Sequence, residues 1–124
     1  MEIRDLIGVK YTDGGRSKEE GFDCYGLVIE VLRRAGIRMP DIEYETAKGN
    51  TGAYKEAIGT GRFKKLENLE PYSILALTVN GQPTHCGVYL GEGKMIHSTE
   101  REGVTICNIQ RWTNRIAGVY KVTD

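Results

Sequence analysis

Cys24 opens the segment of this 124-residue chain whose pattern is most clearly helical. A helix N-terminus carries a partial positive charge and free N–H groups, and both stabilise a thiolate. The thiolate is the attacking form of cysteine, and the same N–H groups can hold the oxyanion that forms when a carbonyl is attacked. Cys24 is therefore the candidate nucleophile of a cysteine hydrolase, although a lone cysteine at a helix start is more often a small buried apolar residue.

The only two histidines of the chain, His85 and His97, fall on neighbouring predicted strands. Strand alternation puts His85, Gly87 and Tyr89 on one face, and Gly87 leaves room beside the imidazole. We expect His85 to take the thiol proton and His97 to hydrogen-bond its far ring nitrogen and fix its tautomer. Either histidine alone is more often a satisfied, half-buried side chain, but with Cys24 the pair forms a nucleophile, a base and an orienting group.

The helix that must position Cys24 is predicted over residues 24–35, where apolar residues recur on one face at helical spacing. Asp23 is a good N-cap residue and Gly36 a good stop signal. The negative charge of Asp23 would raise the pKa of the adjacent thiol, so the helix terminus and a protonated His85 must outweigh it if a thiolate forms.

The second half of the chain predicts antiparallel strands, with Asn80 and Gly81 as a hairpin signal between two of them. The predicted strands cover residues 63–66, 73–79, 85–90, 94–98, 104–109 and 116–122. Short helices are predicted over residues 2–7, packing through Ile3, Leu6 and Ile7, and over residues 53–58. Residues 8–23 are predicted as an irregular loop. A helical first half followed by strands is an α+β layout, and the length predicts a single domain over residues 1–124.

The charge balance argues against two classes of partner. Lys and Arg together number 17, as do Asp and Glu, so the formal net charge is zero. A nucleic-acid binder or a polybasic membrane patch would show a basic surplus, and we expect neither. The longest uncharged stretch, residues 71–91, has a polar centre at residues 80–85 that a hydrocarbon core would not tolerate, so we expect no membrane span.

Cysteine usage and the first residues bear on the compartment. Three cysteines, with no CxxC spacing, favour a reducing environment, and Cys86 and Cys107 are expected to be reduced core residues. The chain begins with charged residues and has no apolar region of a signal peptide. We therefore expect it to be cytoplasmic as synthesised, and to reach a phage virion or the cell wall by another route.

Two long stretches combine these residues in order. Residues 21–37, GFDCYGLVIEVLRRAGI, contain the nucleophile, and residues 85–98, HCGVYLGEGKMIHS, contain both histidines. They resemble the Asp-Cys-Ser-Gly-Leu-Val helix start and the His-Val-Gly-Ile-Tyr-Leu-Gly strand of the NlpC family of papain-like cell-wall cysteine peptidases. GVKY and GG in the first loop also match that family, and the ending, RWTNRIAGVYKV, resembles its phage-tail-type members. The resemblance covers most of the chain.

The resemblance implies a papain-like α+β fold in which the nucleophile helix packs on an antiparallel sheet. It implies a Cys-His-His triad of Cys24, His85 and His97, with no cofactor and no metal. Family members cut peptidoglycan stem peptides, often at the bond between γ-D-glutamyl and a diamino acid, so a stem peptide is the expected partner. Phage tail proteins are candidate partners too, and the alternative function is a tail assembly or binding module with weak or no hydrolytic activity.

The resemblance also implies substrate-binding roles for Tyr11 and Asp23, near the amine end of a short peptide, and for Tyr25. Tyr25 replaces the serine that usually follows the nucleophile, which puts the family's peptide preference in doubt. Each residue has a structural alternative: Asp23 as the helix cap, Tyr11 as a loop anchor and Tyr25 as a core residue. Residues 71–73, Pro-Tyr-Ser, replace the family's Pro-Gly-Asp, and we expect only a local change in that turn.

Two other chemistries compete with this reading. The zinc-ligand types in the chain are Cys24, His85, Cys86, His97 and Cys107. Adjacent His85 and Cys86 point to opposite faces of a strand, so both can bind one ion only across a bulge, and Cys107 joins such a site only if it turns toward it. A related acyltransferase or amidase is the other alternative. Its circularly permuted members place the histidine before the cysteine, whereas Cys24 precedes His85 here.

Overall fold

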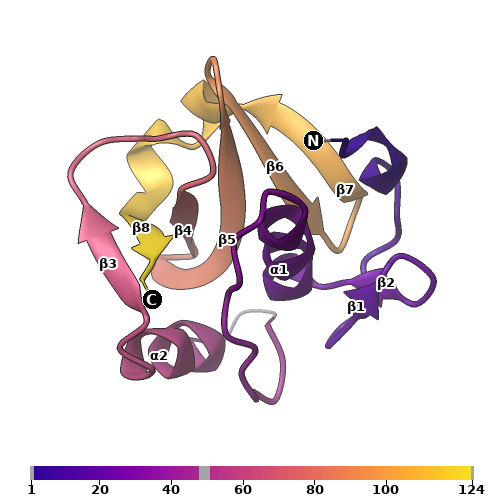
Figure 1. Ribbon diagram of the computed structural model, residues 1–124, viewed down its shortest axis with the longest axis horizontal. Helices are drawn as coiled ribbons and strands as arrows, with labels where there is room; N and C mark the ends of the chain where they lie inside the picture. Colours follow the sequence, from indigo (N-terminus) through magenta and orange to yellow (C-terminus); the bar gives the residue numbers. More distant parts are fainter. Residues whose placement is uncertain (1, 48–50, 124) are drawn as a thin grey trace.

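The computed structural model describes residues 2–47 and 51–123 (Figure 1). Within these residues, an antiparallel sheet runs in the order β3–β8–β4–β5–β6–β7, and helix α1 packs against β5 and β6. The strands are β3 Phe63–Leu66, β4 Ile74–Val79, β5 Gln82–Gly91, β6 Lys94–Thr99, β7 Gly103–Asn108 and β8 Ile116–Val122. This arrangement confirms the predicted α+β layout.

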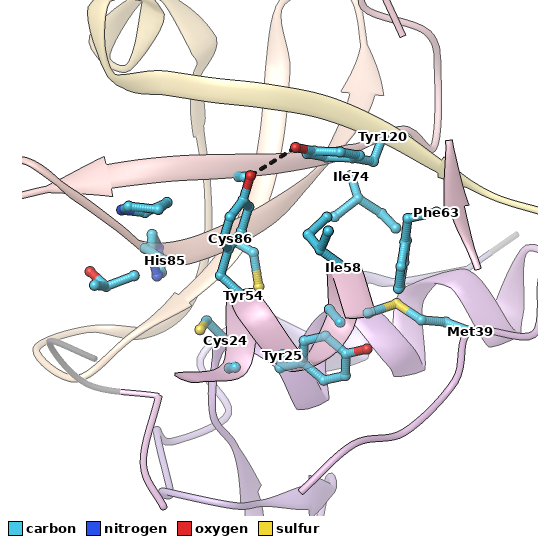
Figure 2. A pocket seen from close by; sticks show the side chains of 15 residues that line it. Cys24, Tyr25, Met39, Tyr54, Ile58, Phe63, Ile74, His85, Cys86 and Tyr120 are labelled. Carbon is cyan, nitrogen blue, oxygen red and sulfur yellow. Dashed lines mark hydrogen bonds between the residues drawn. The ribbon is translucent and has the colours of Figure 1, made fainter. Parts of the chain in front are cut away.

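Helix α1, Cys24–Arg34, begins at the predicted residue because Asp23 caps it. The Asp23 carboxylate accepts a hydrogen bond of 2.7 Å from the N–H of Gly26, one of the donors that a helix start leaves without an intrahelical partner. Gly36 ends the helix with a φ of +81°, a conformation that suits glycine. Figure 2 shows Cys24, in the first turn, on the side of α1 that faces His85 and Cys86 of β5.

The apolar stripe of α1 anchors the helix to the sheet. Leu27, Val28 and Val31 are fully buried, and they share one cluster with Val88 of β5 and Ile96 of β6. Burying an aliphatic side chain of this size contributes about 1.5–3 kcal/mol. The opposite face of the sheet carries a smaller cluster of Leu75, Leu77, Met95, Ile109 and Val119.

The strand predictions hold within a few residues. Asn80 and Gly81 form the turn between β4 and β5 with φ values of 53° and 79°, as the hairpin signal predicts. Strand β5 begins three residues earlier than predicted, at Gln82, and its pairing with β4 shifts between Leu77 and Thr78. Helix α2, Gly52–Gly59, corresponds to the helix predicted over residues 53–58.

Two expectations for the first 23 residues were wrong. The helix predicted over residues 2–7 is a single 3-10 turn, η1 Arg4–Leu6, and Ile7 is 44% exposed rather than packed. The segment predicted as an irregular loop contains a two-stranded sheet of β1, Arg16–Ser17, and β2, Gly21–Phe22. Such two-residue strands are too short to show an alternating pattern in the sequence.

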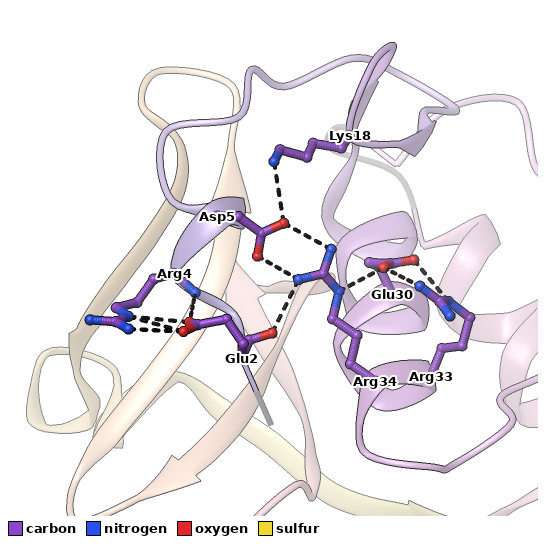
Figure 3. Close-up of polar contacts among 7 residues, drawn as sticks. All are labelled: Glu2, Arg4, Asp5, Lys18, Glu30, Arg33 and Arg34. Atoms are coloured by element: carbon purple, nitrogen blue, oxygen red, sulfur yellow. Dashed lines mark hydrogen bonds and ion pairs between the residues drawn. The ribbon is translucent and has the colours of Figure 1, made fainter.

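A surface network ties η1 to the end of α1 (Figure 3). Arg34 pairs with Asp5 of η1 and, through a 2.8 Å contact, with Glu30 one turn back in its own helix. Lys18 also pairs with Asp5, and Glu2 accepts from Arg34 through its main-chain carbonyl. Single exposed ion pairs contribute little to the free energy of unfolding, so the effect of this network is to fix the path of the chain toward β1 and β2.

In the described part of the chain, no helix has the length and apolar character needed to cross a membrane.

Gly26 provides a test of how tightly the first turn of α1 packs on the loop before it. A Cβ at this position would lie 2.1 Å from the carbonyl oxygen of Gly15 and 2.9 Å from the Arg16 guanidinium. We expect Gly26→Ala to lower the free energy of unfolding by about 1–3 kcal/mol in urea titrations. Gly59→Ala is the matched control, because a Cβ there meets nothing within 4 Å, and it should be neutral or stabilising by up to about 1 kcal/mol. Equal effects of the two substitutions would contradict this packing.

Candidate active site

The Cys24 thiol lies between the side chains of two consecutive residues of β5. It is 4% exposed, and both the Cys86 thiol and the His85 imidazole are within hydrogen-bonding reach of it. The hydrogen bond from Cys86, then the hydrogen bond and the charge of His85, lower the pKa of Cys24 to about 5. Burial and the charge of Asp23 oppose this shift without cancelling it. The thiolate is therefore the stable form of Cys24 at neutral pH.

Cys86, expected from the sequence to be a core residue, with a zinc ligand as the alternative, is a direct neighbour of the nucleophile. It packs with Val88 and Leu90 in the cluster on the α1 side of the sheet, as strand alternation predicts. That side is also where α1 begins, so the thiol meets Cys24. The hydrogen bond to Cys24, then burial and the negative charge on Cys24, raise the pKa of Cys86 well above the ordinary thiol value, which keeps it protonated as a donor. Both are free cysteines.

The structure brings His85 and His97 together. The Nε2 atom of His85 lies 2.8 Å from Nδ1 of His97, and the ring centroids are 5.1 Å apart. His97 is 5% exposed. Burial, and then the charge of His85, lower the pKa of His97 to about 4, so this imidazole is neutral at pH 7. One ring nitrogen of His85 is therefore engaged by His97, which leaves its other nitrogen for the thiol.

Trp112 and Cys107 complete the surroundings of the imidazoles. The sequence had placed Cys107 there only in the zinc alternative, and it had not indicated Trp112 at all. The Trp112 ring lies 5.6 Å from each imidazole, tilted by 36° to His85 and edge-on to His97. The Cys107 sulfur is 3.6 Å from Nε2 of His97. Both residues come from β7 and the turns that follow it, and no local sequence signal links them to the histidines.

Asp23 is fully buried, and its carboxylate accepts four hydrogen bonds. Oδ1 accepts from Gly26 N–H at 2.7 Å and from the Arg16 guanidinium at 2.9 Å. Oδ2 accepts from Gly14 N–H at 3.0 Å and from the Tyr44 hydroxyl at 2.6 Å. Arg16 and Tyr44, which the sequence analysis did not single out, therefore hold the helix cap in place. These contacts use the acceptor capacity of the carboxylate, so it can influence a ligand only through the groups that it holds.

Two cavities flank Cys24 and His85. One, about 60 Å³, has apolar walls that include Tyr25, Met39 and Ile58, and Figure 2 shows Tyr54 of α2 meeting Tyr120 of β8 across it through a 2.9 Å contact. The other is an open cleft of about 360 Å³. Its lining residues beside the nucleophile and base are Tyr11, Ala47, Val79, Thr84, Ser98, Thr99, Glu100 and Trp112.

The predicted pocket residues divide between these spaces. Tyr11 is half-buried in the wall of the open cleft. Tyr25 lies in the apolar cavity, is 5% exposed and donates a 2.7 Å hydrogen bond from its hydroxyl to the carbonyl of Pro40. The Arg16 guanidinium sits 5.8 Å from its ring centroid. Tyr25 is thus both a core residue and part of a cavity wall beside Cys24.

The described residues, 2–47 and 51–123, contain no group of three or more His, Cys, Asp or Glu side chains arranged to hold a metal ion. The Cys86 thiol contacts Cys24, whereas the Cys107 thiol contacts His97. The thiols and imidazoles are thus arranged as a chain of hydrogen bonds.

A helix that starts at a cysteine and packs on an antiparallel sheet with a histidine pair is the architecture of papain-like α+β proteins. Within this class the chain belongs to the NlpC/P60 family, whose sequence profile matches residues 8–121. The NlpC/p60 domain of the peptidoglycan hydrolase SagA has a similar structure, with a TM-score of 0.61 at 22% identity over 96% of this chain and 90% of that chain. An NlpC/P60 family protein from Bacillus cereus ATCC 10987 gives a TM-score of 0.67 at 22% identity, covering 96% of this chain and 37% of that one.

Two relatives from Bacillus subtilis (strain 168) are closer in sequence. A gamma-DL-glutamyl hydrolase is 35% identical over 98% of this chain. The bifunctional muramidase/DL-endopeptidase CwlT is 34% identical over 75% of it. The chain spans only 28% and 26% of the lengths of these two proteins.

The lowered pKa of Cys24 predicts the pH dependence of its alkylation. We expect the rate of iodoacetamide labelling at Cys24 to rise with pH around a midpoint of about 5, measured by peptide mapping after brief exposure. Both Cys86→Ala and His85→Ala should move the midpoint upward, because each removes a group that stabilises the thiolate. Cys107 is an internal control, since burial raises its pKa and it should label only at higher pH. A Cys24 midpoint near the ordinary thiol value of about 8.5 would reject an activated nucleophile.

Proposed function

We propose that this chain is a cysteine peptidase that hydrolyses peptidoglycan stem peptides at a bond between γ-D-glutamyl and a diamino acid. The main support is the row formed by the Cys24 thiolate, His85 and His97, with 2.8 Å between the two imidazoles. Membership of the NlpC/P60 family and the names of two relatives, a gamma-DL-glutamyl hydrolase and a DL-endopeptidase, favour this bond.

In the proposed reaction the Cys24 thiolate attacks the amide carbonyl and forms a tetrahedral oxyanion. The N–H groups of Cys24 and Tyr25, in the first turn of α1, then hold that oxygen. Gly26 N–H is engaged by Asp23 and does not contribute. Protonated His85 then gives its proton to the leaving amine, and the C–N bond breaks to leave a thioester on Cys24.

Hydrolysis of the thioester reverses these roles. Neutral His85 takes a proton from a water molecule, the resulting hydroxide attacks the acyl carbon, and Cys24 leaves as the thiolate. His97 stays neutral throughout, because burial lowers its pKa to about 4. It accepts a hydrogen bond from His85 and orients the ring. The cycle needs no redox or group-transfer partner beyond water.

The open cleft is the proposed peptide site, since its volume of about 360 Å³ falls in the range of ligand sites. Tyr11 in its wall is then in a position to contact the peptide near its amine end. Asp23 supports this end indirectly, by holding Gly14 and Arg16. Tyr25, which stands where the family has a serine, walls the apolar cavity on the other side of Cys24, so this side should favour an apolar substrate group.

The phage-tail alternative stays a prediction. The resemblance of residues 111–122 to phage-tail-type members motivated it, and neither the site geometry nor the relatives reported above bear on it. Action on peptidoglycan would require delivery of the chain to the cell wall, by a phage particle or another route.

The covalent mechanism predicts a graded series of variants. Cys24→Ala should abolish release of the diamino acid product from a γ-D-glutamyl–diamino acid peptide, measured by mass spectrometry, because no thioester can form. His85→Ala should lower kcat/KM by about 10²–10⁴-fold through loss of the acid and base, and His97→Ala should have a smaller effect. Lys65→Ala, at an exposed position of β3, is the control and should be unaffected. Circular dichroism of each variant checks that the fold is retained.

Each alternative result has a distinct meaning. Residual turnover by Cys24→Ala would reject the covalent mechanism. Equal losses in His85→Ala and His97→Ala would reject the division into base and orienting group. Cleavage of another stem-peptide bond, dependent on Cys24, would change the proposed bond and leave the mechanism in place.

A further inference from the structure

The hydrogen bond between the imidazoles has only one possible polarity when His85 is protonated. An imidazolium carries N–H on both ring nitrogens, so Nε2 of His85 must donate and Nδ1 of His97 must accept. His97 is neutral, because burial and the charge of His85 lower its pKa to about 4. The single proton of its ring must then sit on Nε2. Any group that fixes this tautomer of His97 helps to stabilise the charged form of His85.

The group at Nε2 of His97 is the thiol of Cys107, 3.6 Å away on the neighbouring strand β7. Thr105 pairs directly with His97 and Met95 with Cys107, so the imidazole and the thiol are diagonal neighbours on one face of the sheet. Burial raises the pKa of Cys107, so the sulfur remains a neutral thiol that can accept a hydrogen bond. The charged side chains that act on this thiol are Arg111, Glu102 and Lys94.

The Cys107 sulfur also accepts a hydrogen bond from the side chain of Trp112. An indole N–H can only donate, so the thiol is the acceptor. The indole ring lies 5.6 Å from both imidazoles, and the Arg115 guanidinium sits 5.1 Å from the indole ring. Cys107 and Trp112 also pack on the same apolar cluster behind the sheet. One sulfur thus contacts both His97 and the ring that lies against the histidine pair.

We propose that Cys107 is a positioning residue of the active site, which accepts hydrogen bonds from His97 Nε2–H and from the Trp112 indole and so leaves Nδ1 of His97 free to accept from His85. The proposal rests on the proposed function for the role of His85 as base. The tautomer itself can be measured without any substrate.

The test compares Cys107→Val, which has similar volume and no acceptor, with Cys107→Ser, which keeps one. Protein labelled with ¹⁵N-histidine gives signals from only two imidazoles, and a His85→Ala sample identifies those of His97. In long-range ¹H–¹⁵N spectra at pH 7 we expect His97 to carry its proton on Nε2 in the parent protein and in Cys107→Ser. Cys107→Val should show a mixture of tautomers. The midpoint of Cys24 alkylation against pH should also rise, by about one pH unit for one lost hydrogen bond.

Ile106→Ala is the matched control, because Ile106 is the adjacent residue of β7 and is 41% exposed. It should change neither the tautomer nor the alkylation midpoint. An unchanged His97 tautomer in Cys107→Val would overturn the proposal, even if activity fell, since the loss would then be structural. Failure of the proposed function looks different: the parent protein would cleave no stem peptide, while the tautomer would still respond to Cys107→Val. Recovery in Cys107→Ser of the tautomer lost in Cys107→Val would support positioning by hydrogen bonding over packing alone.

Discussion

The buried carboxylate of Asp23 is the interaction on which the site depends. A carboxylate that is fully buried is costly unless it is paired and hydrogen-bonded, and here four donors surround it. Two of them, Gly14 N–H and the guanidinium of Arg16 in β1, come from the segment before the helix, and a third, the Tyr44 hydroxyl, comes from the segment after it. The same carboxylate caps α1. The start of the helix, and with it the position of Cys24, is therefore fixed from both sides of the chain.

This arrangement places a negative charge next to a thiol that must itself become negative. Arg16 compensates much of the charge of Asp23 locally, and the remaining repulsion is a minor influence on the pKa of Cys24. The deciding groups are on β5: the Cys86 thiol donates a hydrogen bond to the thiolate, and His85 supplies a hydrogen bond and a charge. The contacts around Asp23 thus stabilise the start of the helix. The residues of the sheet, Cys86 and His85, activate the nucleophile.

The features that could be predicted from the sequence are those that depend on residues close together in the chain. The cap at Asp23, the apolar stripe of α1 and the Asn80–Gly81 turn depend on nearby residues, and all three are present in the structure. Family resemblance added the order of cysteine and histidines. What could not be predicted comes from contacts between distant segments: Tyr44 with Asp23, Cys107 with His97, and Trp112 with both imidazoles. Strand alternation put Cys86 on the face opposite His85, but only the packing of α1 shows that this face meets the nucleophile.

The register of three adjacent strands explains why these distant residues meet. In the order β5–β6–β7, His85, His97 and Cys107 lie one per strand, so a hydrogen-bonded row can run across the sheet. Side chains alternate between faces, and a slip of one residue in β6 would turn His97 toward the α1 side, where Ser98 now bonds the carbonyl of Phe22. Met95 and Ile96, the two residues that precede His97, are fully buried on opposite faces of the sheet and oppose such a slip. The hydrogen-bonded row is therefore specified by the same apolar packing that holds the sheet together, whereas part of the cleft wall, including Tyr11 and Ala47, comes from residues outside this sheet.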